Sequence, residues 1–217
     1  MPHFDAILFD LDGTLIDSVA DIAGAVNHVR VEMGMPRLPL EVVRTYIGDG
    51  VHILMERALK TKDPAIIDKA IALWRPHYTA HCLDHTCLYP GVREMLIALT
   101  SSGMPLGVVS NKPVAPSETI LAGLEIRKVF SAVVGGDSTP KRKPDPEPLQ
   151  FALEQMNIIS KRVLVVGDSP IDIEAARRAG CASCGVLWGI GQEKTIHAAR
   201  PDYLARAPDE VSKIVYI

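Results

Sequence analysis

The sequence reads DLDGTLID from Asp10 to Asp17, directly after the apolar run Ala6–Phe9. A short apolar run of this kind indicates a strand that is buried on both faces. The end of that strand directs Asp10 towards the sheet edge, and the turn that Gly13 permits brings Asp12 to the same point. Two carboxylates about 4 Å apart repel each other by roughly 4 kcal/mol at an effective dielectric constant of about 20. The stretch therefore predicts a divalent cation, and the alternative is a surface turn in which Asp and Gly are ordinary turn residues.

Four further apolar runs extend the pattern, and segments with helical periodicity separate the later ones. The runs are Leu106–Val109, Ala132–Val134, Val163–Val166 and Gly185–Leu187. Alternating strands and helices predict an α/β fold with a Rossmann-like parallel sheet and helices on both faces, a three-layer α/β/α core. In such sheets the binding crevice lies just beyond the carboxyl ends of the strands.

The alternation is interrupted once, after the first strand. We predict a small all-helical domain over residues 17–85, inserted into an α/β core formed by residues 1–16 and 86–217. No strand is expected inside the insertion, because its apolar residues recur at helical spacing. Ser18 is expected to cap the first helix, and Asp63, which precedes a proline, to begin the last one.

Polar residues also stand at three later positions that the predicted topology brings near the first strand. Ser110 and Asn111 end a strand in VVSN, and their hydroxyl and amide donors suit phosphate oxygens. Lys143 lies in KPDP, where the prolines stiffen the backbone. GDSPID places Asp168 at a strand end and Asp172 in a first helical turn, a spacing that suits Mg²⁺. Taken singly, each has an ordinary alternative: a polar strand end, a solvated loop lysine or a helix N-cap.

Together these residues predict one site, because parallel strands bring their carboxyl ends to the same edge of the sheet. Several carboxylates would be balanced there by Mg²⁺, by Lys143 and by donors that hold an incoming phosphate. This arrangement suits phosphoryl transfer, in which catalysis depends mostly on positioning and charge stabilisation.

The motifs DLDGTLID, VVSN, the lysine of KPDP, and GDSPID resemble the four signature motifs of the haloacid dehalogenase superfamily, in its aspartate-nucleophile phosphohydrolase branch. The resemblance spans essentially the whole chain, and an insertion after the first motif matches the helical cap class. It implies a Mg²⁺-dependent phosphatase acting on a small-molecule phosphomonoester. Within the cap, YIGDG (Tyr46–Gly50) and LMERAL (Leu54–Leu59) resemble the caps of bacterial phosphoglycolate phosphatases. We therefore expect 2-phosphoglycolate as substrate, with a sugar-phosphate phosphatase or a phosphomutase of the same superfamily as the alternative.

The resemblance also implies roles for single residues. Asp10 attacks phosphorus and forms an aspartyl phosphate, while Asp12 protonates the leaving oxygen and later accepts a proton from water. The expected ligands of Mg²⁺ are Asp10, Asp12 through its backbone carbonyl, Asp168 and Asp172. The expected phosphoryl-binding residues are Ser110, the backbone amide of Asn111, and Lys143.

Substrate choice is expected to lie in the cap. Gly48 and Gly50 allow a cap loop to approach the crevice closely. A substrate that bears a carboxylate also calls for a cation, for which Arg57 and Arg44 are the candidates. The alternative for Arg57 is an exposed helix arginine.

Composition narrows the class of protein further. The 217 residues are 47% hydrophobic and 23% charged with a net charge of -3, which argues against a disordered chain and against nucleic-acid or membrane partners. The N-terminus lacks the basic start of a signal peptide, and only four Cys are present, so we expect a cytoplasmic protein. The sequence leaves open whether the chain is a monomer or a homodimer.

Two remaining features are given no role in the predicted site, and one further class of protein is an alternative. His77, His81 and His85 recur every four residues but lack the carboxylate base of a recognised zinc motif. Cys181 and Cys184 enter a predicted strand and are expected to be buried thiols. A phospho-aspartate receiver also combines acids, a hydroxyl and a lysine at strand ends, but it has neither DxDGT nor an inserted helical domain.

Overall fold

The computed structural model describes residues 3–159 and 162–216, and its main element is a six-stranded sheet in the order β5-β4-β1-β6-β7-β8. All neighbouring strands are parallel. The strands are β1 (Ala6–Phe9), β4 (Leu106–Val109), β5 (Ala132–Val134), β6 (Val163–Gly167), β7 (Ala182–Val186) and β8 (Tyr203–Ala205). The predicted α/β class and the parallel sheet are therefore confirmed.

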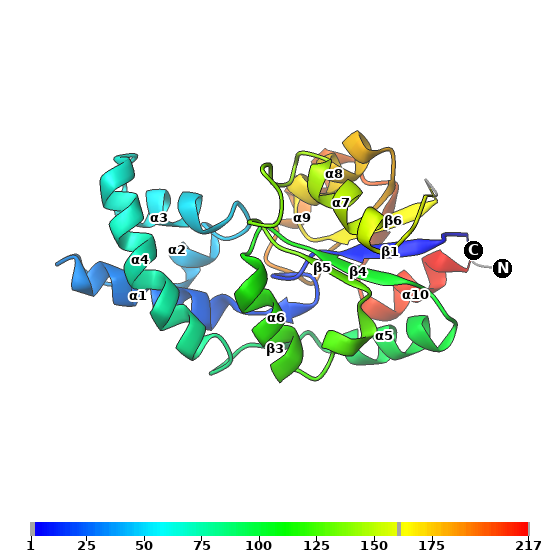
Figure 1. Cartoon of the computed structure of the whole chain (residues 1–217), viewed down its shortest axis with the longest axis horizontal. Coiled ribbons are helices and arrows are strands. Elements are labelled where there is room, and N and C mark those ends of the chain that lie inside the picture. Colours follow the sequence, from blue (N-terminus) through cyan, green and yellow to red (C-terminus); the bar gives the residue numbers. More distant parts are fainter. Residues whose placement is uncertain (1–2, 160–161, 217) are drawn as a thin grey trace.

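Helices cover both faces of this sheet, as Figure 1 shows. They are α5 (Val92–Ser101), α6 (Val114–Gly123), α7 (Glu147–Gln155), α8 (Pro170–Ala179), α9 (Glu193–Ala199) and α10 (Pro208–Val215), with a 3₁₀ turn over Arg127–Val129. In β1, Ile7 and Phe9 face the apolar cluster that includes α5 and α10, whereas Leu8 faces the cluster of α7 and α8. Successive strand residues point to opposite faces, so a strand covered on both sides must be apolar at every position.

The five predicted strands are present in the sheet, and the structure differs from the prediction in some bounds and in the number of strands. β6 extends one residue beyond the predicted run, to Gly167. The seventh strand begins at Ala182, earlier than the predicted run, and ends at Val186. The eighth strand, β8, was not predicted, because it is a three-residue edge strand whose middle residue, Leu204, is 38% exposed and which therefore lacks a buried apolar run.

Four helices lie together at one end of the molecule (Figure 1): α1 (Val19–Glu32), α2 (Leu40–Arg44), α3 (Val51–Leu59) and α4 (Pro64–His81). They leave and rejoin the core through a two-stranded antiparallel ribbon of β2 (Ile16–Asp17) and β3 (Cys87–Leu88). These helices fall inside the segment predicted as a cap, and its boundaries as a separate domain stay a prediction.

The helical segment is fixed to the core by the side chain of Asp21, near the start of α1. Its buried carboxylate accepts hydrogen bonds from the backbone amides of His85 and Thr86 and from the Thr86 hydroxyl. The outgoing and returning chains are thereby joined where they enter the core. Among the described residues, no helix combines the length and the apolar character that crossing a bilayer requires.

Candidate active site

Four neighbouring strands end at one edge of the sheet, and polar residues of the predicted site follow them. Asp10 comes directly after β1, Ser110 after β4, and Asp168 after β6, while Lys143 lies in the loop that follows β5. The sheet order β5-β4-β1-β6 places these four positions side by side. The topology therefore gathers residues that lie far apart in the sequence.

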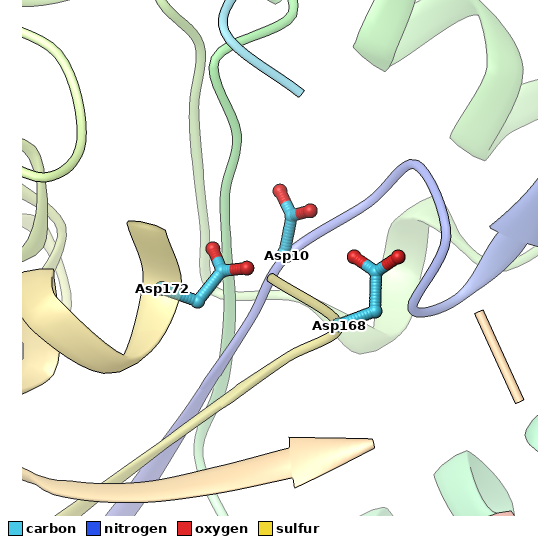
Figure 2. Close-up of side chains that lie close together, drawn as sticks. All are labelled: Asp10, Asp168 and Asp172. Carbon is cyan, nitrogen blue, oxygen red and sulfur yellow. The ribbon is translucent and has the colours of Figure 1, made fainter. Parts of the chain in front are cut away.

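Three aspartates converge at this edge. Figure 2 shows the carboxylates of Asp10, Asp168 and Asp172 around a common space. One oxygen from each lies within 4.8 Å of the others. Asp168 and Asp172 are buried, and Asp10 is slightly more open.

Lys143 links two of these aspartates. Its Nζ donates to Asp10 Oδ1 at 2.8 Å and to Asp172 Oδ1 at 2.6 Å, and its side chain is buried. Asp172 also accepts hydrogen bonds from the backbone amide and hydroxyl of Ser169, which forms a capping box at the start of α8. Asp172 therefore caps α8, as the alternative for this residue stated, and also lies in the cluster of three aspartates.

Asp168 is held by backbone groups. Its Oδ2 accepts from the amides of Ile190 and Gly191 at 2.8 and 2.9 Å. Gly13 closes over the same carboxylate at φ +88°, and a Cβ there would lie 2.2 Å from Asp168 Oδ2. Only glycine fits this turn, so DLDGT brings the first motif into direct contact with Asp168.

Burial shifts the pKa values of the carboxyl groups upwards. Desolvation raises the pKa of Asp10 to about 6, although the Lys143 ammonium opposes this shift. Desolvation, together with the charges of Asp10 and Asp172, raises the pKa of Asp168 to about 7. One ammonium therefore does not balance the negative charge of the cluster.

This donor set fits Mg²⁺. Three carboxylates with one ammonium leave two negative charges in a buried space, and the oxygens lie close enough to share one ion. Mg²⁺ prefers oxygen ligands and is usually bound through few carboxylates, keeping several waters. Within the part of the chain that the structure describes, the side chain of Asp10 accepts one hydrogen bond, from Lys143, whereas those of Asp168 and Asp172 accept three each, so Asp10 has the most oxygen lone pairs left for an ion.

Asp12 has a different environment. Its Oδ1 accepts a hydrogen bond from Ser18 at 2.5 Å, and its Oδ2 pairs with Lys112 at 3.0 Å. Ser18 stands at the N-cap of α1, but its hydroxyl makes no capping bond. The prediction of a capping side chain at Ser18 was therefore wrong, because the hydroxyl is used by Asp12 instead.

Two of the three predicted phosphate-binding residues, Ser110 and Asn111, line a cavity of about 40 Å³ together with Asp10 and Asp12, whereas Lys143 does not line it. Ser110 and Asn111 are both buried. The Asn111 Nδ2 donates to the carbonyls of Gly48 and Lys143, each at 3.1 Å. This amide side chain thereby joins the α2–α3 loop to the loop that carries Lys143.

The predicted cap glycines lie in that α2–α3 loop and line the same cavity. Gly48 and Gly50 have φ values of +120° and +88°, which favour glycine. A Cβ on Gly50 would lie 3.2 Å from the carbonyl oxygen of Asn111. The loop therefore approaches the core as closely as the sequence suggested.

The two predicted cap cations lie in different places. Arg44 donates to the Gly189 carbonyl at 3.1 Å and lines a larger, open cavity with Asp10, Asp12 and Asp168. Arg57 donates to the Tyr46 carbonyl, pairs with Asp49, and lines a separate surface pocket. The structure brings Arg44 to the aspartates and does not bring Arg57 there.

The sequence matches the family model of haloacid dehalogenase-like hydrolases over residues 7–186. The chain belongs to this family. This haloacid dehalogenase-like hydrolase is 38% identical to the phosphoglycolate phosphatase of Neisseria meningitidis serogroup A, over 96% of this chain and 92% of the relative. It is 36% identical to the phosphoglycolate phosphatase of Escherichia coli K12, over 94% of this chain and 90% of the relative.

Solved structures agree with this assignment. The crystal structure of a predicted phosphoglycolate phosphatase from Haemophilus somnus 129PT has a TM-score of 0.92 and 33% identity, covering 99% of both chains. The resemblance to the superfamily and its fold are confirmed, and the relatives and the fold support phosphoester hydrolysis.

Sequence reasoning missed part of the site of this haloacid dehalogenase-like hydrolase. Lys112 directly follows VVSN and contacts Asp12. Gly191 and Ile190 follow β7, the next strand beyond β6, and hold Asp168. Lys112 follows β4, and Ile190 and Gly191 follow β7, so their positions after strands of the sheet could have indicated that they lie near the site. Trp188 also follows β7, and its Nε1 donates to the Thr14 carbonyl at 3.0 Å.

Proposed function

We propose that this haloacid dehalogenase-like hydrolase cleaves 2-phosphoglycolate to glycolate and inorganic phosphate through an aspartyl-phosphate intermediate. The observation that carries the proposal is the convergence of Asp10, Asp168, Asp172 and Lys143 at one sheet edge, with Asp12 beside them. The substrate is supported by relatives named phosphoglycolate phosphatase that match nearly the whole chain.

In the first step, a carboxylate oxygen of Asp10 attacks phosphorus. The bond from phosphorus to the substrate oxygen breaks, the electron pair stays on that oxygen, and the carboxyl group of Asp12 supplies its proton. Glycolate leaves, and the phosphoryl group is bound to Asp10.

In the second step, a water oxygen attacks the phosphorus of the aspartyl phosphate. The carboxylate of Asp12 accepts the water proton, and the bond from phosphorus to the Asp10 oxygen breaks. Inorganic phosphate leaves and both aspartates return to their starting state, so the cycle consumes one water.

The other residues stabilise charge and position the substrate. Ser110, the Asn111 backbone amide and Lys143 are proposed to hold the phosphoryl oxygens. Asp10, Asp168 and the Asp12 carbonyl would hold Mg²⁺, with Asp172 supporting them and fixing Lys143. Bound there, Mg²⁺ neutralises charge on the transferring phosphoryl group. We also propose a cytoplasmic enzyme, because the cysteines of the structure are free thiols, as in a reducing compartment.

A phosphate-release assay over a panel of small phosphomonoesters with Mg²⁺ tests the proposal. The panel includes 2-phosphoglycolate and hexose phosphates, and we expect the highest kcat/KM with 2-phosphoglycolate. Asp10→Asn is expected to lower turnover by on the order of 10³-fold or more without loss of the fold. A preference for hexose phosphates would favour a sugar-phosphate phosphatase, and isomer interconversion with little free phosphate would favour a phosphomutase. Substantial turnover by purified Asp10→Asn enzyme would refute the nucleophile.

A further inference from the structure

The carboxylate of Asp12 is fixed at both of its oxygens. Ser18 donates to Oδ1 at 2.5 Å, and the Lys112 ammonium lies 3.0 Å from Oδ2. The side chains of Asp12 and Lys112 are 11% and 4% exposed, so little water competes for these contacts. A carboxylate that is held at both ends in a dry environment has one defined orientation.

Lys112 is itself held by a residue of the helical segment. Its Nζ donates to the Tyr78 hydroxyl oxygen at 2.7 Å and lies 4.6 Å from the centre of the Tyr78 ring. Tyr78 belongs to α4 and is fully buried. A buried ammonium requires compensating partners, and Asp12 and Tyr78 supply a negative charge, an acceptor oxygen and an aromatic face.

This arrangement connects the inserted helices to the proposed acid and base. Ser18 precedes α1, and Tyr78 lies near the end of α4, so both contacts depend on how these helices dock on the core. Asp12 and Lys112 line the same cavity as Asp10 and as Trp74 of α4.

We propose that Lys112 is a positioning residue that orients the Asp12 carboxyl group towards the leaving oxygen, and that Tyr78 secures Lys112 for this task. The inference rests on the proposed function, in which Asp12 donates a proton to the leaving group. Lys112 belongs to none of the four motifs. Its role follows from its contact with Asp12 and from its burial beneath α4.

The role predicts a dependence on the leaving group. An alkyl phosphate releases a strongly basic alkoxide that needs a proton, whereas 4-nitrophenyl phosphate releases a phenolate that leaves without one. Loss of Lys112 should therefore slow the first kind of substrate selectively. Because kcat/KM reports steps up to the first irreversible one, it isolates leaving-group departure from hydrolysis of the phosphoenzyme.

The experiment compares wild type, Lys112→Met, Tyr78→Phe and Lys213→Met on 2-phosphoglycolate, ethyl phosphate and 4-nitrophenyl phosphate. Lys112→Met is expected to lower kcat/KM for both alkyl phosphates by about 100-fold, and for the aryl phosphate by less than about 5-fold. Tyr78→Phe keeps the ring and removes only the hydroxyl, so it tests the same contact if Lys112→Met fails to fold. It should lower kcat/KM for the alkyl phosphates by roughly 5-fold and leave that for the aryl phosphate nearly unchanged. Lys213→Met removes an exposed lysine on α10 and should match wild type.

Three outcomes would overturn the inference. An equal loss on all three substrates in a folded variant would indicate a structural or phosphate-binding role. A loss confined to 2-phosphoglycolate would make Lys112 a ligand of the substrate carboxylate. Unchanged kinetics would deny any role. Wild-type activity on ethyl phosphate but not on 2-phosphoglycolate would instead contradict the proposed substrate, and the comparison of alkyl with aryl phosphate would still test Lys112.

Discussion

At the scale of single residues, Lys143 allows two aspartates to share one buried space. Its ammonium contacts Asp10 and Asp172 from the inside of the cluster. Burial acts to lower the pKa of Lys143, but these two carboxylates raise it by more, so the lysine stays charged. We propose that the same ammonium also contacts a phosphoryl group bound near Asp10, in addition to holding the two carboxylates.

Replacing Lys143 by Met should therefore destabilise the protein. Removal of one partner from a buried charged pair typically costs about 3–5 kcal/mol, because the other charge stays buried without compensation. We expect a loss of this size in the free energy of unfolding, measured by urea denaturation in EDTA at pH 8. Lys141→Met is the control, since Lys141 is exposed and pairs with Asp145 at the surface, and it should unfold like wild type.

The loss should shrink as the pH falls. Desolvation raises the folded-state pKa of Asp10 to about 6 in the wild type and Lys143 opposes this rise, so loss of Lys143 should raise that pKa further. As the pH falls, the folded variant then takes up a proton on Asp10 before the folded wild type or the unfolded chain does, and its stability recovers by more than that of the wild type. A deficit in Lys143→Met that is as large at pH 5.5 as at pH 8 would contradict this account of the cluster.

Site residues could be predicted from the sequence where they directly follow a strand and belong to a short motif. Asp10, Ser110 and Asp168 are fixed by strand ends that the sequence indicates directly. Lys112 also follows a strand, but its burial depends on Tyr78, which lies 34 positions earlier and docks through tertiary packing. Local sequence shows neither that contact nor the loss of solvent around the lysine.

At the scale of elements, the fold was predictable where strands are buried on both faces. Such runs are absent from the two-residue strands β2 and β3 and from the edge strand β8. A short ribbon or an edge strand is not buried on both faces, so its residues need not all be apolar. The first and last helices of the insertion, α1 and α4, were predictable from their apolar spacing. Asp63 caps α4 as expected, through a hydrogen bond from the Ala65 amide at 2.9 Å.

The junction between α1 and the returning chain gives a prediction at this scale. Asp21→Ala removes the acceptor for two backbone amides and one hydroxyl near Thr86. Leaving buried donors unsatisfied costs about 1–3 kcal/mol, so the free energy of unfolding should fall by roughly 2 kcal/mol. Urea denaturation measures this loss, with Asp68→Ala on the exposed face of α4 as the control. If both variants unfold alike, the Asp21 contacts contribute nothing to stability.

At the scale of the whole molecule, one cation should connect the ends of β1 and β6. Asp10 and Asp168 come from neighbouring strands, and Gly13 and Gly191 close around the Asp168 carboxylate. A ligand that binds only the folded state stabilises the whole molecule through its binding equilibrium. The charge left in the cluster should therefore make global stability depend on Mg²⁺.

We expect Mg²⁺ at about 100 times its dissociation constant to add roughly 2.7 kcal/mol. For a chain of this size, that gain raises the Tm by about 5–10 °C.

Thermal unfolding followed by circular dichroism, in Mg²⁺ and in EDTA at matched ionic strength, measures the shift. Asp168→Asn keeps the size of the side chain but removes a charged ligand, so its Tm should respond much less to Mg²⁺. Asp209→Asn, which changes an exposed side chain of α10, should respond like wild type. An equal response in Asp168→Asn would place the stabilising ion elsewhere, because the cluster at the ends of β1 and β6 would then not be what binds it.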